Sequence, residues 1–362
     1  MKTRPRRSAT ALTTAALAAA LALSLTGCVE SGRSSSAATA SEPSDCPWEA
    51  DDSVTTTARI AWQAIPNADV VVKDLGLLEA CMPNAEITWV QAASGGDVVK
   101  YYGSGDVDLG LMGSSPATIA SSEPVVRDVD IAVVWIHDVI GDAESLVVKD
   151  PAVTGLEDLR GGRIGVPFSS TAHYSLLQAL TEAGLDPATD VEVVNLDPEK
   201  MPGAWQGDQI DAAWVWDPVQ TQLLDDGGTR LLSSADTAKA GRPTFDVGTA
   251  DRGFVAENPA FMEQWAKAQD HAVGLVKDDP STAAESVAAV LGIDPADAEK
   301  QFAGLSYLTA QEQVDYLSAS FPDDLLTTAG FLLDQGGIEA VGTAEEYAEH
   351  VDAGPAKSAL GG

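Results

Sequence analysis

The sequence predicts an α/β protein with two lobes, and three observations support this prediction. First, short apolar segments typical of β-strands alternate with segments of helical spacing along most of the chain. Second, one arrangement occurs twice, at residues 106–122 and 161–180: an apolar strand, a cluster of serine and threonine, and the start of a helix. Third, about 310 residues follow the N-terminal leader and tether, which is too many for one small hydrophobic core.

The first lobe is expected to contain a sheet covered by helices. Apolar segments predict strands at residues 58–63, 86–94, 107–113, 130–139 and 143–150. Helical spacing separates the earlier strands, at residues 67–82, 95–105 and 114–122.

The same alternation then resumes in a second unit. A short helix, a glycine turn and a strand are expected over residues 155–168, and a helix over 171–185. Strands at 190–197 and 210–218 flank a short helix at 201–209. After a strand that begins near residue 246 the chain reads as helical, and a block of helices without a new sheet is expected to pack back on the first lobe.

The two hydroxyl clusters have two interpretations. Serine and threonine are common helix N-caps, so ordinary capping explains each cluster. A helix N-terminus also offers unpaired N–H groups and about half a positive charge, so it can bind an anion without lysine or arginine. Because strand ends face the ligand crevice in open α/β sheets, two such N-termini from two lobes are expected to meet at one cleft.

The N-terminus resembles an export signal followed by a lipidation site. A basic start, MKTRPRRSAT, precedes an apolar run from Ala11 to Leu25 that is too short to span a bilayer comfortably. The run ends in Leu-Thr-Gly before Cys28, which resembles a lipobox with cleavage before Cys28 and lipid on its sulfur. The following Ser- and Ala-rich residues read as a flexible tether. We therefore expect a signal peptide at 1–27, a tether at 28–53, and a protein held outside the cell by its lipid.

The net charge of the chain disfavours nucleic acid as a partner and limits how a small anion can be bound. The formal net charge is −34, which disfavours nucleic acid and supplies no basic stripe for phosphates. A bound anion must therefore be held by local groups, and a zwitterion avoids most of the long-range repulsion.

Two cysteines remain after lipidation, Cys46 and Cys81. In an oxidising compartment they are expected to form a disulfide, with two free buried thiols as the alternative.

An ordered set of segments carries a family resemblance: QAASGGDVVKYYGSGDVDLGLMGSSP, HDVIGDAESLVVKD, IGVPFSSTAHYSLLQAL, VVNLDP, AWQGDQIDAAWVWDP and GRPTFDV. Together these segments resemble the taurine-binding subfamily of ABC-transporter substrate-binding proteins, over about residues 58–352. The resemblance implies a type II periplasmic-binding-protein fold, with the chain crossing between lobes near Lys149–Asp150 and near Arg242–Asp246. Lobe 1 would then comprise 54–149 and 247–362, and lobe 2 would comprise 150–246.

The resemblance also implies a cleft that captures taurine and delivers it to a transmembrane permease with its cytoplasmic ATPase, the protein acting as a monomer without cofactor or metal. The sulfonate would meet hydroxyls and N–H groups of the two clusters, and the ammonium would meet a carboxylate. The cleft walls would include aromatic and polar side chains. The expected ligand-binding residues are Gln63, Ser114, Ser115, Glu144, Ser170, Thr171, His173, Trp214, Trp216, Asp217 and Asp246.

The expectations for individual residues differ in strength. Trp214 and Trp216 alternate with Val215, so both would face one side of a strand and wall a short carbon chain, with core packing as the alternative. His173 would orient the cap or line the cleft, with a packed histidine as the alternative. Asp217 ranks below the other two acids because many taurine-binding relatives have a different residue there.

Two other functions are also compatible with the sequence. A receptor of the same fold for another alkanesulfonate, nitrate or a small amine-containing solute would differ at the acids. A hydrolase would use Ser170 and His173, but the sequence has no G-x-S-x-G elbow, no H-E-x-x-H motif and no nucleotide-binding glycine loop. The sequence therefore favours a binding protein over an enzyme.

Overall fold

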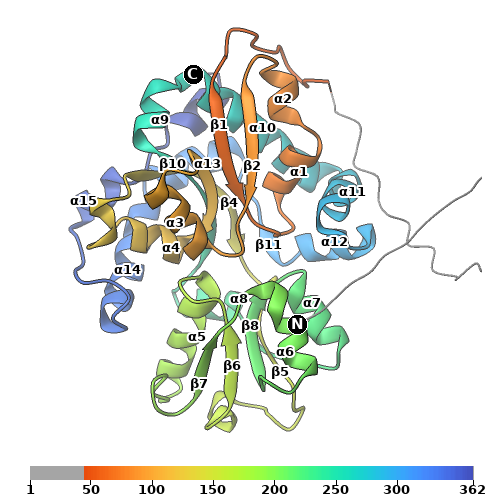
Figure 1. The fold of residues 1–362 in the computed structure, drawn as a ribbon, viewed down its shortest axis with the longest axis vertical. Coiled ribbons are helices and arrows are strands. Elements are labelled where there is room, and N and C mark those ends of the chain that lie inside the picture. Colours follow the sequence, from red (N-terminus) through yellow and green to blue (C-terminus); the bar gives the residue numbers. More distant parts are fainter. Residues whose placement is uncertain (1–44, 362) are drawn as a thin grey trace, which may run out of the picture. The chain divides into compact units, whose positions relative to one another are not determined.

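The computed structural model describes residues 45–361. The expected signal peptide, the lipidated Cys28 and the tether up to residue 44 lie outside the described residues. The described part forms two sheets with helices packed against them (Figure 1). Among the described residues, none of the helices combines the length and the hydropathy needed to cross a bilayer.

The first sheet has six strands in the order β11-β4-β10-β3-β1-β2. β1 runs parallel to β2 and β3, whereas β10 runs antiparallel to β3 and β4. The chain therefore returns from the second sheet to the first at β10, which lies between β4 and β3. The strands are β1 (Thr57–Trp62), β2 (Glu86–Gln91), β3 (Leu109–Gly113), β4 (Ile131–Ile140), β10 (Phe245–Asp251) and β11 (Leu305–Ser306).

Helices cover both faces of this sheet. One apolar cluster contains Trp135, Phe261 and Trp265, and another contains Phe245 and Phe321. The later helices contribute to both clusters, so the C-terminal block packs back on the first sheet as expected. The helices are α1 (Ala68–Asp74), α2 (Leu77–Cys81), α3 (Gly95–Ser104), α4 (Ser114–Ala120), η1 (Val125–Arg127), α9 (Arg252–Glu257), α10 (Pro259–Asp278), α11 (Pro280–Leu291), α12 (Pro295–Phe302), α13 (Ala310–Leu317), α14 (Phe321–Asp334), α15 (Ala344–Glu349) and α16 (Gly354–Ala359).

The second sheet has five strands in the order β7-β6-β8-β5-β9. β6 is parallel to β7 and β8, and β5 is antiparallel to β8 and β9. The strands are β5 (Glu144–Val148), β6 (Arg163–Val166), β7 (Glu192–Asn195), β8 (Ala212–Trp216) and β9 (Thr229–Ser233). The helices are η2 (Leu156–Leu159), α5 (Thr171–Glu182), η3 (Pro198–Lys200), α6 (Met201–Gln206), α7 (Val219–Asp225) and α8 (Ser234–Lys239). Buried Trp205 and Trp214 belong to its two apolar clusters.

The chain changes sheets earlier than the sequence suggested. β4 belongs to the first sheet and β5 to the second, so the first crossing is the short segment 141–143 rather than the region of Lys149–Asp150. The return runs through residues 240–244, which places Asp246 on β10 of the first sheet. β4 and β5 are both largely apolar, and an apolar pattern does not reveal which sheet a strand joins.

Cys46 and Cys81 form a disulfide, the pairing expected from the sequence. Cys81 is the last residue of α2 and is fully buried. The bond therefore fastens the start of the described chain to the first lobe.

Candidate functional site

A small pocket lies between the two sheets and is lined from both. Its volume is about 20 Å³, which is room for about one or two water molecules. A larger solute therefore requires the lobes to separate. The lining residues are Gln63, Ile65, Pro66, Gly95, Gly113, Pro116, Ile140, Ala143, Glu144, Ser170, Thr171, Trp216, Asp217, Asp246 and Leu305.

The N-terminus of α5 forms one wall of the pocket. Ser170 is the N-cap: its hydroxyl oxygen accepts from the His173 backbone N–H at 3.1 Å and its hydroxyl donates to the Pro167 carbonyl at 2.6 Å. The Ser170 side chain therefore acts as an ordinary N-cap, which is the first of the two interpretations of this cluster. The backbone N–H groups of Thr171 and Ala172, also in the first turn, have no acceptor within the helix, so they remain available to a ligand.

The N-terminus of α3 approaches from the other lobe. A methyl group on Gly96 would lie 3.3 Å from the Ser169 side chain, and one on Gly113 would lie 2.5 Å from Thr171 Cγ2. Both glycines thus allow backbone from the first lobe to approach the start of α5 closely. Because each helix N-terminus carries about half a positive charge, this side of the pocket favours an anion.

Glu144 is held by two hydroxyl groups. Oε1 accepts from Ser234 Oγ and Oε2 accepts from Thr171 Oγ1, both at 2.6 Å. Burial raises the pKa of Glu144 to about 7, against the lowering effect of these two hydrogen bonds. The carboxyl group is therefore poised to change its charge near neutral pH.

Asp246 faces the pocket from β10, and Asp138 lies directly across from it on β4. Asp138 is fully buried and Asp246 is nearly so. Burial raises the pKa of both carboxyl groups, and the negative charges of neighbouring carboxylates raise them further. Two carboxylates cannot both remain charged here without a cation, so this side of the pocket favours a positively charged group.

Asp217 completes the acidic side of the pocket. Its Oδ1 accepts from the backbone N–H and the hydroxyl of Thr221, at 3.0 and 2.7 Å. Its own N–H donates to the Ala143 carbonyl in the first crossing segment. Burial raises the pKa of Asp217 to about 6. No lysine or arginine occurs among the described residues that line the pocket.

The two tryptophans have different positions. Trp216 lines the pocket, whereas Trp214 is fully buried in the apolar cluster of the second lobe, so the aromatic wall consists of one ring. Gln63 lines the pocket and donates through Nε2 to the Leu111 carbonyl at 3.0 Å.

His173 does not reach the pocket. Its ring stacks on Phe168 with the centroids 4.5 Å apart, and burial lowers its pKa to about 4. This arrangement matches the packed-histidine alternative.

Ser114 and Ser115 are buried and do not line the pocket. The Ser114 hydroxyl oxygen accepts from the Phe245 N–H at 3.2 Å, which ties α4 to β10. α4 begins at Ser114 with Gly113 as its N-cap, and Gly113 and Pro116 line the pocket instead of the two serines.

Sequence reasoning missed several lining residues. Ile65, Pro66, Ile140 and Leu305 are apolar and carry no chemical signal of their own. Gly95 did carry a signal, because Ser94-Gly-Gly directly before a helical run is a helix N-terminus that backbone or ligand can approach closely.

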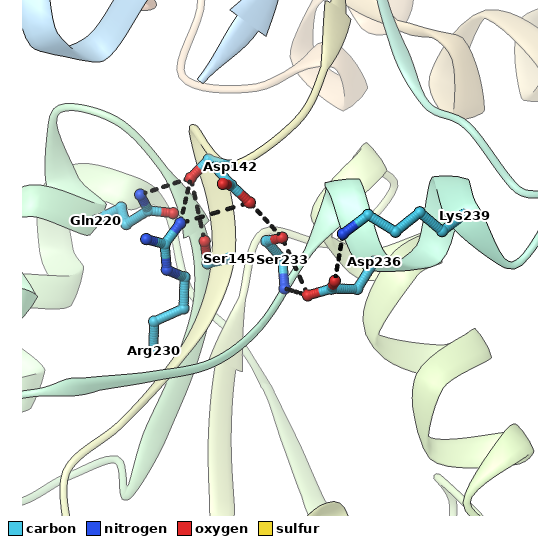
Figure 2. Close-up of polar contacts among 7 residues, drawn as sticks. All are labelled: Asp142, Ser145, Gln220, Arg230, Ser233, Asp236 and Lys239. Atoms are coloured by element: carbon cyan, nitrogen blue, oxygen red, sulfur yellow. Dashed lines mark hydrogen bonds and ion pairs between the residues drawn. The ribbon is translucent and has the colours of Figure 1, made fainter. Parts of the chain in front are cut away.

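The crossing segment 141–143 is anchored to the second lobe through Asp142 (Figure 2). Its carbonyl accepts from Gln220 Nε2 at 3.0 Å, Ser145 Oγ at 3.3 Å and Arg230 Nη1 at 3.4 Å. Its Oδ1 accepts from Ser233 Oγ at 2.6 Å and pairs with Arg230 at 3.5 Å. Asp142 therefore moves with the second sheet.

The same segment is held to the first lobe by one carbonyl. The N–H groups of Gly141 and Ala143 both donate to the Gly304 carbonyl, at 3.0 and 3.1 Å. A side chain on Gly304 would lie 2.5 Å from the Ala143 nitrogen, so only glycine fits there. The crossing is thus fixed from both lobes within three residues, which is the form of a hinge.

The arrangement has no feature of a metal centre. Among residues 45–361, no group of three or more histidine, cysteine, aspartate or glutamate side chains is placed to hold a metal ion.

The chain is similar in sequence and in structure to known binding proteins. The chain is 36% identical over 273 residues to the taurine-binding periplasmic protein of Escherichia coli (strain K12), covering 74% of this chain and 82% of that one. The alkanesulfonate-binding protein SsuA from Xanthomonas axonopodis pv. citri, solved bound to MOPS, superposes with a TM-score of 0.66 at 25% identity, over 82% of this chain and 98% of that chain.

More distant structures share the fold. The periplasmic nitrate-binding protein NrtA from Synechocystis PCC 6803 superposes with a TM-score of 0.68 at 14% identity, covering 85% of this chain and 89% of that chain. The family model described as the NMT1-like family matches residues 56–292. This range contains β1 to β10 and α1 to α11. The chain belongs to the NMT1-like family.

Proposed function

We propose that this protein is the extracytoplasmic solute-binding component of an ATP-binding-cassette importer and that it captures a small aminosulfonate such as taurine. One observation carries the proposal: the pocket between the lobes is lined both by helix N-termini and by the carboxyl groups of Glu144, Asp217 and Asp246. A zwitterion with a strong-acid head and an ammonium group matches both sides. The names of the E. coli and Xanthomonas relatives support sulfonates as the ligand class.

The two ends of the ligand would be held differently. The sulfonate would accept hydrogen bonds from the first N–H groups of α5 and α3, which need no counter-charge from lysine or arginine. The ammonium would donate to Glu144 and Asp246, which are buried and lack a cation. The ring of Trp216 would cover the short carbon chain between the ends.

Ligand size limits the affinity. Taurine has about seven non-hydrogen atoms, and a ceiling of roughly −1.5 kcal/mol per atom limits its binding free energy to about −10 kcal/mol. This ceiling corresponds to a dissociation constant no lower than about tens of nanomolar. Such an affinity suits the scavenging of a dilute solute.

Closure would couple capture to delivery. The pocket is too small for taurine with the lobes as they lie, so binding requires an opening at segments 141–143 and 240–244. The ligand would then stabilise the closed form that a permease recognises. We further propose that lipid on Cys28 and the tether to residue 53 hold the binding lobes outside the membrane. In this account the protein acts as a monomer with its permease and ATPase and without a cofactor.

The relatives named above are binding proteins, and we assign this protein no enzymatic activity. The function is tested by isothermal titration calorimetry with taurine, ethanesulfonate, nitrate and β-alanine. Taurine should bind at least about tenfold more tightly than ethanesulfonate, because only taurine carries the ammonium. Equal affinity for taurine and ethanesulfonate would favour a general alkanesulfonate receptor, and binding of nitrate alone would favour an inorganic-anion receptor. Buffers that contain sulfonates must be avoided, since a relative was solved with MOPS bound.

A further inference from the structure

The carboxyl pair Asp138–Asp246 differs from Glu144 in its hydrogen bonds. Glu144 accepts one hydroxyl donor on each oxygen, so it is satisfied as a carboxylate. Asp138 has only a long contact, 3.5 Å from Asn67 Nδ2 to its Oδ2, and its Oδ1 has no donor among the described residues. A buried carboxylate without donors is costly, so this pair needs a proton.

The position of that proton follows from the same contacts. Asp138 Oδ2 faces Asn67, which leaves Oδ1 as the oxygen without a partner. The two aspartates are opposite each other across β4 and β10, and their carboxyl groups are close enough for Asp138 to donate to Asp246. A proton on Asp138 Oδ1 would satisfy both groups at once.

The surroundings supply no positive charge to the pair. Both aspartates help to raise the pKa of Tyr307, next to β11, after burial as the main cause, and the Tyr307 hydroxyl donates to the Pro66 carbonyl at 3.1 Å. Glu144 on β5 adds a further acidic group. His137 alternates with Asp138 on β4 and packs against Trp265 on the opposite face. No basic side chain in the described chain contributes to this cluster.

We propose that Asp138 stays protonated and donates to Asp246, and that Asp246 releases its own proton to solvent when an ammonium-bearing ligand enters the pocket. The O–H bond of Asp246 breaks, its proton passes to water, and the ligand's N–H group donates to the carboxylate that remains. Asp138 is thus a positioning residue that orients Asp246 without touching the ligand. This inference rests on the proposed function, because it takes a ligand with an ammonium group.

The pair makes the site selective by charge. An empty pocket with Asp246 neutral avoids a buried anion, and only a cationic group makes ionisation of Asp246 favourable. A sulfonate without an amine would leave the proton in place.

The test counts protons during binding. Purified protein is titrated with taurine in weakly buffered salt solution while the proton release is followed with a pH-stat, at about pH 6.5 and at about pH 8, where the amine of free taurine still carries its proton. We expect about one proton per taurine from the pair at the lower pH and a clearly smaller release at the higher pH. Ethanesulfonate should release none at either pH. Because Glu144 also titrates near neutrality, Glu144→Gln is measured in parallel and should keep the release that comes from Asp246.

Two variants of Asp138 separate positioning from packing. Asp138→Asn keeps an acceptor for Asn67 and places an amide donor where Oδ1 was, so it should bind taurine within about threefold of wild type. Asp138→Leu removes the donor and should weaken taurine binding about tenfold and move the proton release to higher pH. Glu285→Gln, an exposed acid on α11, serves as the surface control.

The possible outcomes distinguish the proton release from Asp246, the role of Asp138 and the proposed function. Taurine binding without proton release at either pH would overturn this inference and leave the proposed function intact. Release that disappears in Glu144→Gln would assign the proton to Glu144 instead. Wild-type affinity and an unchanged release profile in Asp138→Leu would remove the role of Asp138. The absence of any taurine binding would overturn both the inference and the proposed function.

Discussion

Thr171 Oγ1 donates to Glu144 Oε2 at 2.6 Å, so the first residue of α5 is bonded to the first residue of β5. One residue belongs to the anion-favouring side of the pocket and the other to the acidic side. This bond joins the two halves of the site and sits immediately after the crossing segment 141–143.

Replacing the Thr171 hydroxyl should lower the stability of the protein and raise the pKa of Glu144. Thr171→Val keeps the shape of the side chain and leaves Glu144 Oε2 without its donor. We expect the free energy of unfolding to fall by about 1 kcal/mol, measured by urea denaturation. The pKa of Glu144 should rise further, because a hydrogen bond that lowers it is lost. Thr171→Ser keeps the hydroxyl and should behave like wild type; equal losses in both variants would show that the methyl group, and not the hydroxyl, is what matters.

Neutralising the acids should change ligand selectivity. Glu144→Gln and Asp246→Asn each remove one carboxylate partner of the ammonium and should weaken taurine binding by about 10- to 100-fold. Ethanesulfonate has no ammonium, so its affinity should stay within about threefold or improve. Calorimetry with both ligands checks this, with Glu285→Gln as the surface control. A parallel loss for both ligands would mean that the acids maintain the pocket's structure and do not select the amine.

Closure depends on the small size of Gly113. An alanine methyl group there would lie 2.5 Å from Thr171 Cγ2, so Gly113→Ala should keep the lobes slightly apart and weaken taurine binding at least about tenfold. The backbone of Gly113 is extended at φ −71°, so alanine introduces no backbone strain. Gly274→Ala in α10, where a methyl group meets nothing within 4 Å, is the matched control. Small-angle X-ray scattering with and without taurine should show less compaction in Gly113→Ala, and wild-type compaction with wild-type affinity would contradict the role given to this contact.

Stability of the free protein should fall as the pH rises toward neutrality. Burial raises the pKa of Glu144 from 4.5 to about 7 and that of Asp217 from 3.8 to about 6. The folded state therefore binds more protons than the unfolded state between those values, so the stabilisation is complete below about pH 4 and is lost as the pH passes through 6 to 7. Urea denaturation at several pH values checks this.

Two comparisons sharpen that test. Glu144→Gln cannot ionise, so its stability should depend less on pH over this range. Saturating taurine should also flatten the profile, because the ammonium compensates the ionised acids. Stability of the free wild-type protein that rises from pH 5 to pH 7 would contradict the assignment of these carboxyl groups as neutral when folded.

Much of the fold could be read from local patterns. The strand–hydroxyl–helix arrangement correctly predicted the helix that starts at Thr171, because an N-cap serine followed by helical spacing is a local signal. The crossing at 141–143 could not be placed, since pairing of Glu144–Val148 with β8 and β9 depends on residues 64 to 88 positions away. Local composition does not encode such partners.

The site was predictable where chemistry is visible in the residue type. Glu144, Asp217 and Asp246 are acids in an otherwise apolar context, and all three line the pocket. Trp214 and Ser114 failed for a geometric reason: each lies within two residues of a lining residue, but its side chain is buried against the lobe's own core or backbone. Asp138 carries the same signal as Asp246, but it was missed because nothing in the sequence places β4 beside β10.

The most direct test of the account is a crystal structure of the protein with taurine. We expect the sulfonate oxygens within hydrogen-bond distance of the backbone N–H groups that begin α5 and α3, and the ammonium nitrogen against Glu144 and Asp246. Taurine in the reverse orientation, or bound outside the pocket between the two lobes, would contradict the account.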